Sequence, residues 1–302
     1  MGALIVHNPS AGEGMVDSAT LRALVATIDH VVAYRSVKDD RWRVEARRAD
    51  VVVVAGGDGT VASVFIEMAG CEVPIIVVAT GTANNVARTL RLPTDEPLSV
   101  LTSVANYPVR PFDIPSATML SLGKSVRFVE TVGAGLFADL LADKDHRPTA
   151  GEGNEDGWQR LGRLLAHSTE VAWTIEIDGT DVSGRYIAVE AMNIAQTGPN
   201  ITLAPGADPG DGRLDLVVIG ADDRQALQHH IERRRLGEEP EWPNLSVHRG
   251  RSIILSSPET SRVRIDDQLY DSHPTTNSTN VSIEVDGLSV LVAAGRAGSL
   301  VE

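Results

Sequence analysis

The chain has 302 residues and carries 41 acidic residues against 27 lysines and arginines, which gives a formal net charge of -14. So acidic a surface does not suit nucleic acid, and anionic membranes would repel it unless a local basic patch compensates. The single cysteine, Cys71, excludes an intramolecular disulfide framework and a thiol-rich zinc site. No apolar run approaches the ~18 residues of a transmembrane helix. We therefore expect a cytoplasmic protein.

Up to the segment that begins at residue 107, short apolar segments alternate with amphipathic or polar ones. Strands are predicted at 3–6, 30–34, 51–54 and 74–79, and helices at 17–28, 39–49, 60–70 and, after a turn, within 81–92. Short and wholly apolar strands between helices are typical of a parallel sheet that is buried on both faces. The sequence therefore predicts an α/β domain in this part of the chain.

Three prolines in "YPVRPFDIP", residues 107–115, mark a domain boundary. Strands dominate beyond it, and two of the predicted hairpins turn at Asp178-Gly179 and at Asp286-Gly287. Helices are predicted near 157–167 and at 223–237, and a polar, glycine-rich loop at 143–157. This pattern predicts a second, β-rich domain built as a mostly antiparallel sandwich.

Three loops follow three strands of the predicted parallel sheet. They begin at Asn8 ("NPSAGEG"), Gly56 ("GGDGT") and Gly81 ("GTANN"). Because the carboxyl ends of parallel strands meet at one edge of a sheet, these loops are expected to converge. Their glycines allow close approach of a ligand, the following helix N-termini favour an anion, and Thr60 can cap a helix and offer its hydroxyl to phosphate. The three loops together predict a phosphate-binding site.

Asp58 places a carboxylate inside this phosphate loop. The arrangement is explained if a magnesium ion lies between the carboxylate and the phosphates, because Mg²⁺ is normally held by carboxylates and nucleotide oxygens. The alternative is a plain turn in which Asp58 caps the next helix.

These motifs resemble the diacylglycerol kinase catalytic family, the bacterial soluble lipid kinases related to sphingosine kinases. The three loops resemble the nucleotide loops of that family. Three later segments resemble its lipid-site segment, a structural magnesium loop and its Asp-Gly-Glu motif; they are "FVETVGAGLFADL" (128–140), "LAPGADPGDGRLDLVVI" (203–219) and "RVRIDDQL" (262–269). The loop "GGDGT" alone would not separate these enzymes from the more distant NAD kinases, whereas the later segments favour lipid kinases.

The resemblance implies an α/β nucleotide-binding domain at 1–111, to which 295–302 return, and a β-sandwich lipid-substrate domain at 112–294, with the site in the cleft between them. It implies transfer of the γ-phosphate of ATP, with Mg²⁺, to a lipid hydroxyl of diacylglycerol or a relative, during transient peripheral contact with a membrane. The implied nucleotide contacts are Asn8, Pro9, Gly12, Gly56, Gly57, Asp58, Gly59, Thr60, Gly81, Thr82, Asn84 and Asn85.

The resemblance also implies catalytic and substrate roles for five residues. Asp58 and Asp113 would position Mg²⁺ directly or through water, and Asp266 would orient or deprotonate the attacking hydroxyl. Asp139 and Gln268 would lie near the substrate, and Gln268 would share one face of an extended strand with Asp266. Asp113 could instead be a boundary-turn residue, and Asp139 a solvated helix residue.

A structural cation is implied at the oxygen-rich turn that contains Asp208, Asp211 and Arg213, although a plain acidic turn remains the alternative. The chain departs from the family pattern at Asn85 and Gln268, where amides replace the usual carboxylates and cannot act as bases. Two other functions therefore stay open: a non-catalytic nucleotide- or lipid-binding protein, and a kinase for a soluble hydroxylated metabolite. A homodimer is also left open.

Overall fold

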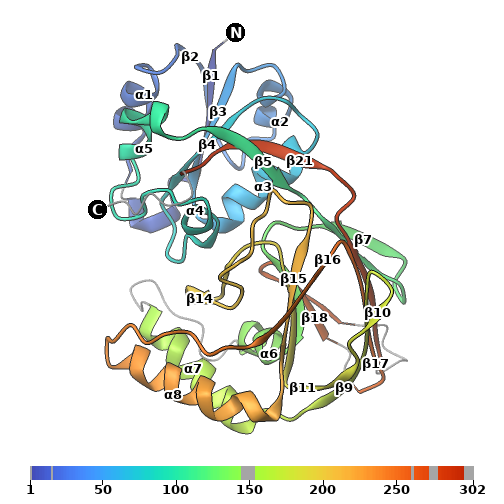
Figure 1. Cartoon of the computed structure of the whole chain (residues 1–302). Helices are drawn as coiled ribbons and strands as arrows, with labels where there is room; N and C mark the ends of the chain where they lie inside the picture. The colour runs from blue at the N-terminus through green and yellow to red at the C-terminus, as the bar shows by residue number, and fades with distance from the viewer. Residues whose placement is uncertain (1, 15, 144–153, 260–261, 272–277, 296–302) are drawn as a thin grey trace. The chain divides into compact units, whose positions relative to one another are not determined.

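The computed structural model describes residues 2–14, 16–143, 154–259, 262–271 and 278–295. It divides into two compact units (Figure 1). The first unit comprises Met1–Ile114 together with Gly287–Glu302, and the second comprises Pro115–Asp286.

The first unit is built on a six-stranded sheet in the order β2-β1-β3-β4-β21-β5. The strands are β1 (Ala3–His7), β2 (Val31–Ser36), β3 (Val51–Gly56), β4 (Ile75–Ala79), β5 (Val109–Asp113) and β21 (Ser289–Ala293). All pairs are parallel except β21 with β5. Every residue of β1 and β4 is buried, as expected for apolar strands that are covered on both faces. The predicted parallel-sheet α/β architecture is confirmed.

Short helices connect these strands. They are α1 (Ser18–Val25), α2 (Arg41–Ala46), α3 (Asp58–Met68), α4 (Asn85–Thr89) and α5 (Ser99–Thr102), with 3₁₀ turns at Ala11–Gly14 and Val104–Asn106. Asp17 begins α1 by accepting hydrogen bonds from the backbone N–H groups of Ala19 and Thr20. The helix predicted to start at Thr60 starts two residues earlier, at Asp58, with Gly57 at its N-cap.

The strand β21 belongs to the first unit, so the predicted hairpin around Asp286-Gly287 is wrong. The preceding strand β20 (Thr279–Glu284) alternates buried and less buried residues and pairs within the sandwich, whereas β21 pairs with β5 and, at one position, with β4. Its apolar residues Val290 and Val292 are fully or almost fully buried there. The chain therefore returns to the first unit at Gly287 instead of 295, and it leaves that unit after Ile114 instead of 111.

The second unit is an antiparallel sandwich, as predicted. One sheet has the order β10-β9-β17-β20-β6-β7, with β11 paired to β9, and the other has the order β16-β15-β12-β8-β18-β19. Their strands are β6 (Ser116–Met119), β7 (Lys124–Arg127), β8 (Thr131–Gly135), β9 (Val171–Ile177), β10 (Thr180–Asp181), β11 (Gly184–Tyr186), β12 (Ala188–Met192), β15 (Leu214–Ile219), β16 (Ser246–Gly250), β17 (Ser252–Ser257), β18 (Arg262–Ile265), β19 (Gln268–Asp271) and β20. A small hairpin joins β13 (Gln196–Thr197) to β14 (Ile201–Thr202).

Apolar residues of both sheets form the sandwich core, among them Phe128, Trp173 and Ile283. The predicted hairpin at Asp178-Gly179 is confirmed, because Ile177 pairs with Thr180 and both turn residues have positive φ.

A second apolar core forms on the outer face of the sheet that has β16 and β19 at its two edges. The helices α6 (Leu136–Ala142), α7 (Asn154–His167) and α8 (Arg224–Arg235) contribute to this core, which confirms helices in the two predicted regions. Most of the loop predicted at 143–157 lies outside the described residues, and α7 already begins at Asn154. None of the helices in the described part of the chain is both long and apolar enough to span a bilayer.

Candidate active site

The structure brings the three predicted phosphate loops to one edge of the first sheet. In register, His7 lies beside Ala55, and Gly56 lies beside Ala79, so β1, β3 and β4 end at nearly the same level. The loops that follow these strands therefore leave from one edge, as the parallel arrangement requires. We call these loops, residues 8–12, 56–60 and 80–85, the loop cluster.

Two glycines let the second and third loops touch. A β-carbon on Gly57 would lie 3.1 Å from the α-carbon of Gly81, and a β-carbon on Gly81 would lie 2.5 Å from that of Gly57. Gly56 is equally constrained, since a β-carbon there would lie 2.5 Å from the β-carbon of Thr60. A side chain would force a shift at Gly56 and Gly81 and would be tight at Gly57, so the backbone itself forms much of the surface.

The first loop is attached to the second through Asn8. Its side-chain amide donates a hydrogen bond to the Thr60 hydroxyl at 3.2 Å, and its carbonyl oxygen accepts one from the N–H of Ser10 at the same distance. Thr60 is buried within the first turn of α3, so it does not cap the helix as predicted. Gly12 has a φ of 59° in the following 3₁₀ turn, and Pro9 is exposed.

Asn84 closes the third loop. Its side chain accepts the N–H of Gly81 and donates to the carbonyl oxygen of Gly81, both at 2.8 Å. Asn84 itself has a φ of 53° and stands at the N-cap of α4. Asn85 is buried in the first turn of α4, whereas Thr82 is exposed. Asn84 therefore shapes the loop, and Thr82 is the more accessible of the two to a ligand.

Asp58 links the second loop to α4. Its carboxylate accepts the N–H of Val86, in the first turn of α4, at 3.0 Å. Burial raises the pKa of Asp58, while backbone hydrogen bonds from Val86, Asn85 and Asn84 oppose that rise. Asp58 therefore holds the start of α4 against the second loop. A cation beside this carboxylate would favour its charged form.

Sequence reasoning missed Thr80, the residue between β4 and Gly81. Its backbone N–H donates to the carbonyl oxygen of Gly56 at 3.0 Å, which holds it inside the loop cluster. Its hydroxyl is buried and has no hydrogen-bond partner among the described residues. A buried hydroxyl normally has a hydrogen-bond partner, and a ligand oxygen could be that partner for Thr80. In the sequence, the position of Thr80 directly before Gly81 could have indicated this role.

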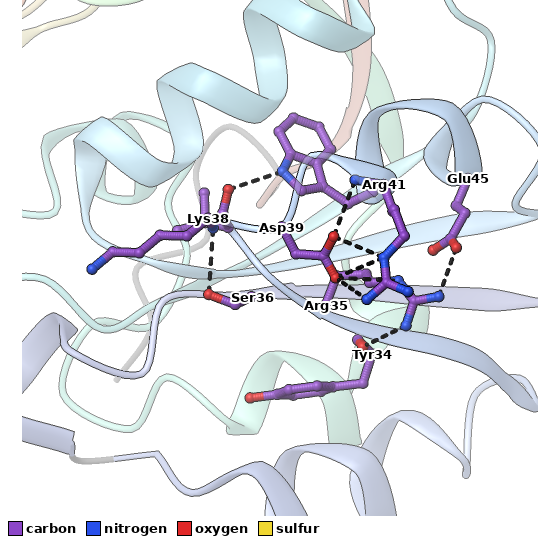
Figure 2. Close-up of polar contacts among 9 residues, drawn as sticks. Tyr34, Arg35, Ser36, Lys38, Asp39, Arg41 and Glu45 are labelled. Carbon is purple, nitrogen blue, oxygen red and sulfur yellow. Dashed lines mark hydrogen bonds and ion pairs between the residues drawn. The ribbon is translucent and has the colours of Figure 1, made fainter.

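The end of β2 also lies at this edge, because Ser36 is in register with His7. Lys38, two residues later, is exposed and forms no ion pair within the described ranges, and Figure 2 shows its side chain directed away from the neighbouring ion pairs. Those pairs join Arg41 to Asp39 at 2.7 Å and Arg35 to Glu45 at 2.6 Å. The Arg41 guanidinium lowers the pKa of Asp39 to about 2. The same strand-end argument that identified the three loops would have identified Lys38.

Asp113 is not part of the loop cluster. It pairs with Ser289, whose carbonyl oxygen accepts the N–H of Gly70 just beyond the C-terminal end of α3. Asp58 begins that helix, and a helix of 11 residues is about 16 Å long. The backbone pairing of Asp113 therefore connects it to the opposite end of α3, and its role toward magnesium stays a prediction.

In the second unit, Asp266 lies in a turn and not in an extended strand. It follows β18 with a φ of 50°, and Ile265 pairs with Gln268 across the turn. One oxygen of its carboxylate accepts the N–H of Val129 at 3.0 Å, and the other accepts those of Glu130 and Thr131 at 2.8 and 3.1 Å. Burial raises the pKa of Asp266 to about 6 against the effect of these three hydrogen bonds. The carboxylate holds the turn onto the neighbouring strand.

Gln268 lies on the sandwich side of this hairpin. Val263 and Ile265 are in the sandwich core, and their cross-strand partners are Tyr270 and Gln268. Gln268 is exposed, and its side-chain oxygen accepts the hydroxyl of Tyr270 at 2.8 Å. The expected shared face with Asp266 is therefore wrong, because the chain reverses between the two residues.

Asp139 lies on α6, which contacts the same hairpin from its other side, within the second apolar core. Its side chain is exposed, partial loss of hydration raises its pKa, and the positive charge of Arg262 opposes that rise. The structure thus does not place Asp139 and Gln268, the two predicted substrate residues, on one face of the hairpin.

In the acidic turn at 208–213, the carboxylates of Asp208 and Asp211 accept hydrogen bonds from the backbone of the turn itself. Asp208 accepts the N–H of Gly210 at 3.1 Å, and Asp211 accepts that of Arg213 at 3.0 Å. Asp211 also forms an ion pair with Arg249. Across the residues that the structure describes, no three histidine, cysteine, aspartate or glutamate side chains gather as metal ligands. A cation at this turn stays a prediction, and backbone carbonyls would have to supply much of its coordination.

Two family models match the chain. The diacylglycerol kinase catalytic domain matches residues 2–117, and the YegS C-terminal NAD kinase beta sandwich-like domain matches residues 158–292. The chain therefore combines a kinase-type nucleotide domain with a β-sandwich domain. More particularly, the chain belongs to the diacylglycerol kinase catalytic-domain family, which confirms the resemblance seen in its motifs.

Relatives and solved structures agree with this assignment. A diacylglycerol kinase of Staphylococcus carnosus is 24% identical over 298 residues, which cover 94% of each chain. A diacylglycerol kinase of Mycobacterium tuberculosis is 24% identical over 214 residues, which cover 70% of this chain and 69% of the relative. The fold matches the crystal structure of a diacylglycerol kinase from Bacillus anthracis with a TM-score of 0.66, at 19% identity and 98% coverage of both chains.

Proposed function

We propose that this protein transfers the γ-phosphate of ATP, with Mg²⁺, to the hydroxyl of diacylglycerol or a closely related lipid. The observation that carries the proposal is the loop cluster, where Gly57 and Gly81 expose backbone to a ligand and the Thr80 hydroxyl lacks a partner. The relatives named diacylglycerol kinase support the choice of lipid. In this proposal the first unit binds the nucleotide and the second binds the lipid.

The loop cluster would bind the phosphates mainly through its backbone. The helix α3 begins at Asp58, and Gly57 at its N-cap has no side chain to cap it, so the N-terminus of the helix can receive an anion. The hydroxyls of Thr80 and Thr82 can donate further hydrogen bonds. The Lys38 ammonium at the end of β2 supplies a positive charge to offset the charge of the nucleotide.

Magnesium, when bound, would supply positive charge that offsets the charge of the phosphates. Asp58 fits such an ion, because it is the carboxylate inside the loop cluster and burial makes its charge costly without a cation. One or two protein carboxylates are enough for a magnesium ion that also binds phosphates and water. Asp58 would therefore position the ion, while its hydrogen bond with Val86 fixes the orientation of the carboxylate.

The turn of the β18–β19 hairpin would serve the lipid hydroxyl. Asp266 already accepts three backbone hydrogen bonds, so we assign it the positioning of this turn ahead of proton abstraction. Phosphoryl transfer asks mainly for positioning and charge neutralisation, and its loose transition state needs little help from a base. The exposed neighbour Asp267 is the carboxylate of this turn that can accept the hydroxyl proton.

The test is steady-state ATP turnover by the full chain with diacylglycerol in mixed micelles, compared with glycerol and with micelles that lack diacylglycerol. We expect Mg²⁺-dependent formation of phosphatidic acid and no turnover with glycerol. Turnover on the soluble alcohol alone would favour a metabolite kinase. Nucleotide binding without turnover on any alcohol would favour a non-catalytic binding protein, the alternative that the amide of Gln268 supports.

A further inference from the structure

The turn between β6 and β7 exposes two leucines in close succession. Leu120 and Leu122 have 52% and 39% of their surface exposed, although side chains of this type are usually buried. The turn is tight, because the N–H of Leu122 donates to the carbonyl oxygen of Met119 at 3.1 Å and Gly123 has a φ of 59°. β7 is the edge strand of its sheet (Figure 1). The leucines are thus held at the tip of an edge hairpin.

A lysine and a tyrosine stand beside these leucines. Lys124, the first residue of β7, is exposed, and its ammonium lies 4.8 Å from the centre of the Tyr270 ring. Tyr270 donates its hydroxyl to Gln268, next to the turn that we assign to the lipid hydroxyl. No acidic side chain in the described ranges forms an ion pair with Lys124, so its charge remains available to an anionic group.

The basic run of α8 is a weaker candidate for the same role. Arg233 forms an ion pair with Glu238, and Arg234 pairs with Glu239 at 3.4 Å, so most of the charge of this run is neutralised. Leu236 is 76% exposed there, but it stands alone between these pairs. These ion pairs leave the surface with little net positive charge to attract anionic lipid, and it offers only one apolar side chain.

We propose that the tip formed by Leu120, Ser121, Leu122, Gly123 and Lys124 inserts into the surface of a phospholipid bilayer. Leu120 and Leu122 enter the boundary between headgroups and acyl chains, and Lys124 contacts an anionic headgroup. The inference rests on the proposed lipid kinase function, because it supplies the surface through which a lipid substrate is reached.

The size and charge of the tip favour a bilayer over a protein partner. Stable protein interfaces bury about 800 Å² on each partner, which is far more than the side chains of one turn can offer. A cation next to two apolar side chains matches a bilayer surface, where acyl chains lie beneath phosphates. Since one lysine supplies the charge and two leucines the apolar area, salt should weaken the contact only slightly.

The first experiment measures vesicle binding by the full chain without nucleotide. The vesicles contain phosphatidylcholine with about one-fifth phosphatidylglycerol, and co-flotation reports binding. We expect the double substitution Leu120→Glu with Leu122→Glu to weaken binding by about 100-fold, roughly tenfold for each leucine. The matched control Leu236→Glu on α8 should leave binding within about twofold. Equal binding by the double variant and the unsubstituted chain would overturn the proposal.

A second measurement locates the tip directly and does not depend on loss of binding. A tryptophan introduced as Leu122→Trp should be quenched by phosphatidylcholine brominated on its acyl chains, and a tryptophan at Leu236→Trp should not. All variants must show the same thermal unfolding midpoint within experimental error, since both sites are exposed. Absence of quenching at position 122 would contradict insertion. Loss of self-association in the double variant, with vesicle binding intact, would identify the tip as a protein interface instead.

Activity separates this inference from the proposed function. With a short-chain, water-soluble diacylglycerol the double variant should keep full turnover, whereas its turnover on vesicles should fall with binding. Equal turnover of both proteins on vesicles would reject the tip and leave the kinase function intact. Vesicle binding through the tip without phosphorylation of either substrate would reject the kinase function and leave the tip intact.

Discussion

Gly57 and Gly81 approach each other so closely that a β-carbon on Gly81 would lie 2.5 Å from the α-carbon of Gly57. The two glycines follow different strands, β3 and β4, and belong to loops that the sequence predicts to converge without showing that their backbones touch. Their contact means that the second and third loops form one continuous backbone surface. A change at either glycine should therefore affect both loops.

The substitution Gly81→Ala should weaken nucleotide binding by at least about tenfold, because the methyl group would separate the loops or displace the Asn84 side chain that closes the third loop. Isothermal titration with a non-hydrolysable ATP analogue and Mg²⁺ measures the effect. The matched control is Gly206→Ala, where a β-carbon meets nothing within 4 Å. Equal affinity of the two variants would show that the glycine contact does not shape the nucleotide site.

The substitution Asp58→Asn separates the structural role of this residue from its role toward metal. The amide oxygen of asparagine can still accept the N–H of Val86, so the thermal unfolding midpoint should change little. The gain in nucleotide affinity that Mg²⁺ provides should fall by about tenfold, since the charge next to the ion is lost. Titrations with and without Mg²⁺ measure that gain. An unchanged gain would exclude Asp58 as the magnesium residue.

Asp266 should make folding stability depend on pH. Burial raises the pKa of its carboxyl group from 3.8 to about 6, so the folded state favours the protonated form. The contribution of this group to the free energy of unfolding is complete below pH 3.8. It falls as the pH rises from there through about 6, because the carboxyl group ionises more readily in the unfolded chain. Thermal unfolding of the unsubstituted chain followed between pH 4 and 7 should show this downward slope on top of all other titrations.

The variant Asp266→Asn should lack that slope. At low pH, where Asp266 is protonated, the variant should also be less stable than the unsubstituted chain by about 1–3 kcal/mol, because an amide NH₂ group would face one of the backbone N–H donors. The control is Asp267→Asn, which changes an exposed carboxylate in the same turn. If both variants keep the slope, another group is responsible for it.

Gln268→Glu should change ATP turnover on diacylglycerol by less than about tenfold, since Gln268 makes a single hydrogen bond with Tyr270 at an exposed position. A catalytic base would contribute about 10²–10⁴-fold. Turnover that appears only in the Gln268→Glu variant would mean that the natural chain is a binding protein. Asp267→Asn, measured in parallel, reports whether the free carboxylate of the turn takes the proton.

The local pattern of the sequence was enough for the first sheet. Four parallel strands, the helices between them and the convergence of Asn8, Gly56 and Gly81 all follow from apolar runs and the rule that parallel strands end at one edge. The antiparallel sandwich and the turn at Asp178-Gly179 also followed from local signals.

The failures concern contacts between distant segments. Nothing within "RVRIDDQL" shows that backbone N–H groups of residues 129–131 capture Asp266 and turn the chain, because the partners lie 135 or more residues away. Likewise, β20 and β21 read as one hairpin, although each finds its partners in a different sheet. Asp113 was assigned from its motif alone, and its pairing with Ser289 was not visible in the sequence.

The pairing of β5 with β21 has a consequence for synthesis of the chain on the ribosome. β5 ends at Asp113, but its only ladder among the described strands is with Ser289–Ala293. While the sandwich emerges and folds, the nascent first unit must carry an edge of unpaired backbone next to β4 until Ser289–Ala293 have been synthesised. The second unit, whose strands pair only with one another, can be complete before the first. Pairing of β21 thus completes the sheet of the first unit as a late step of folding.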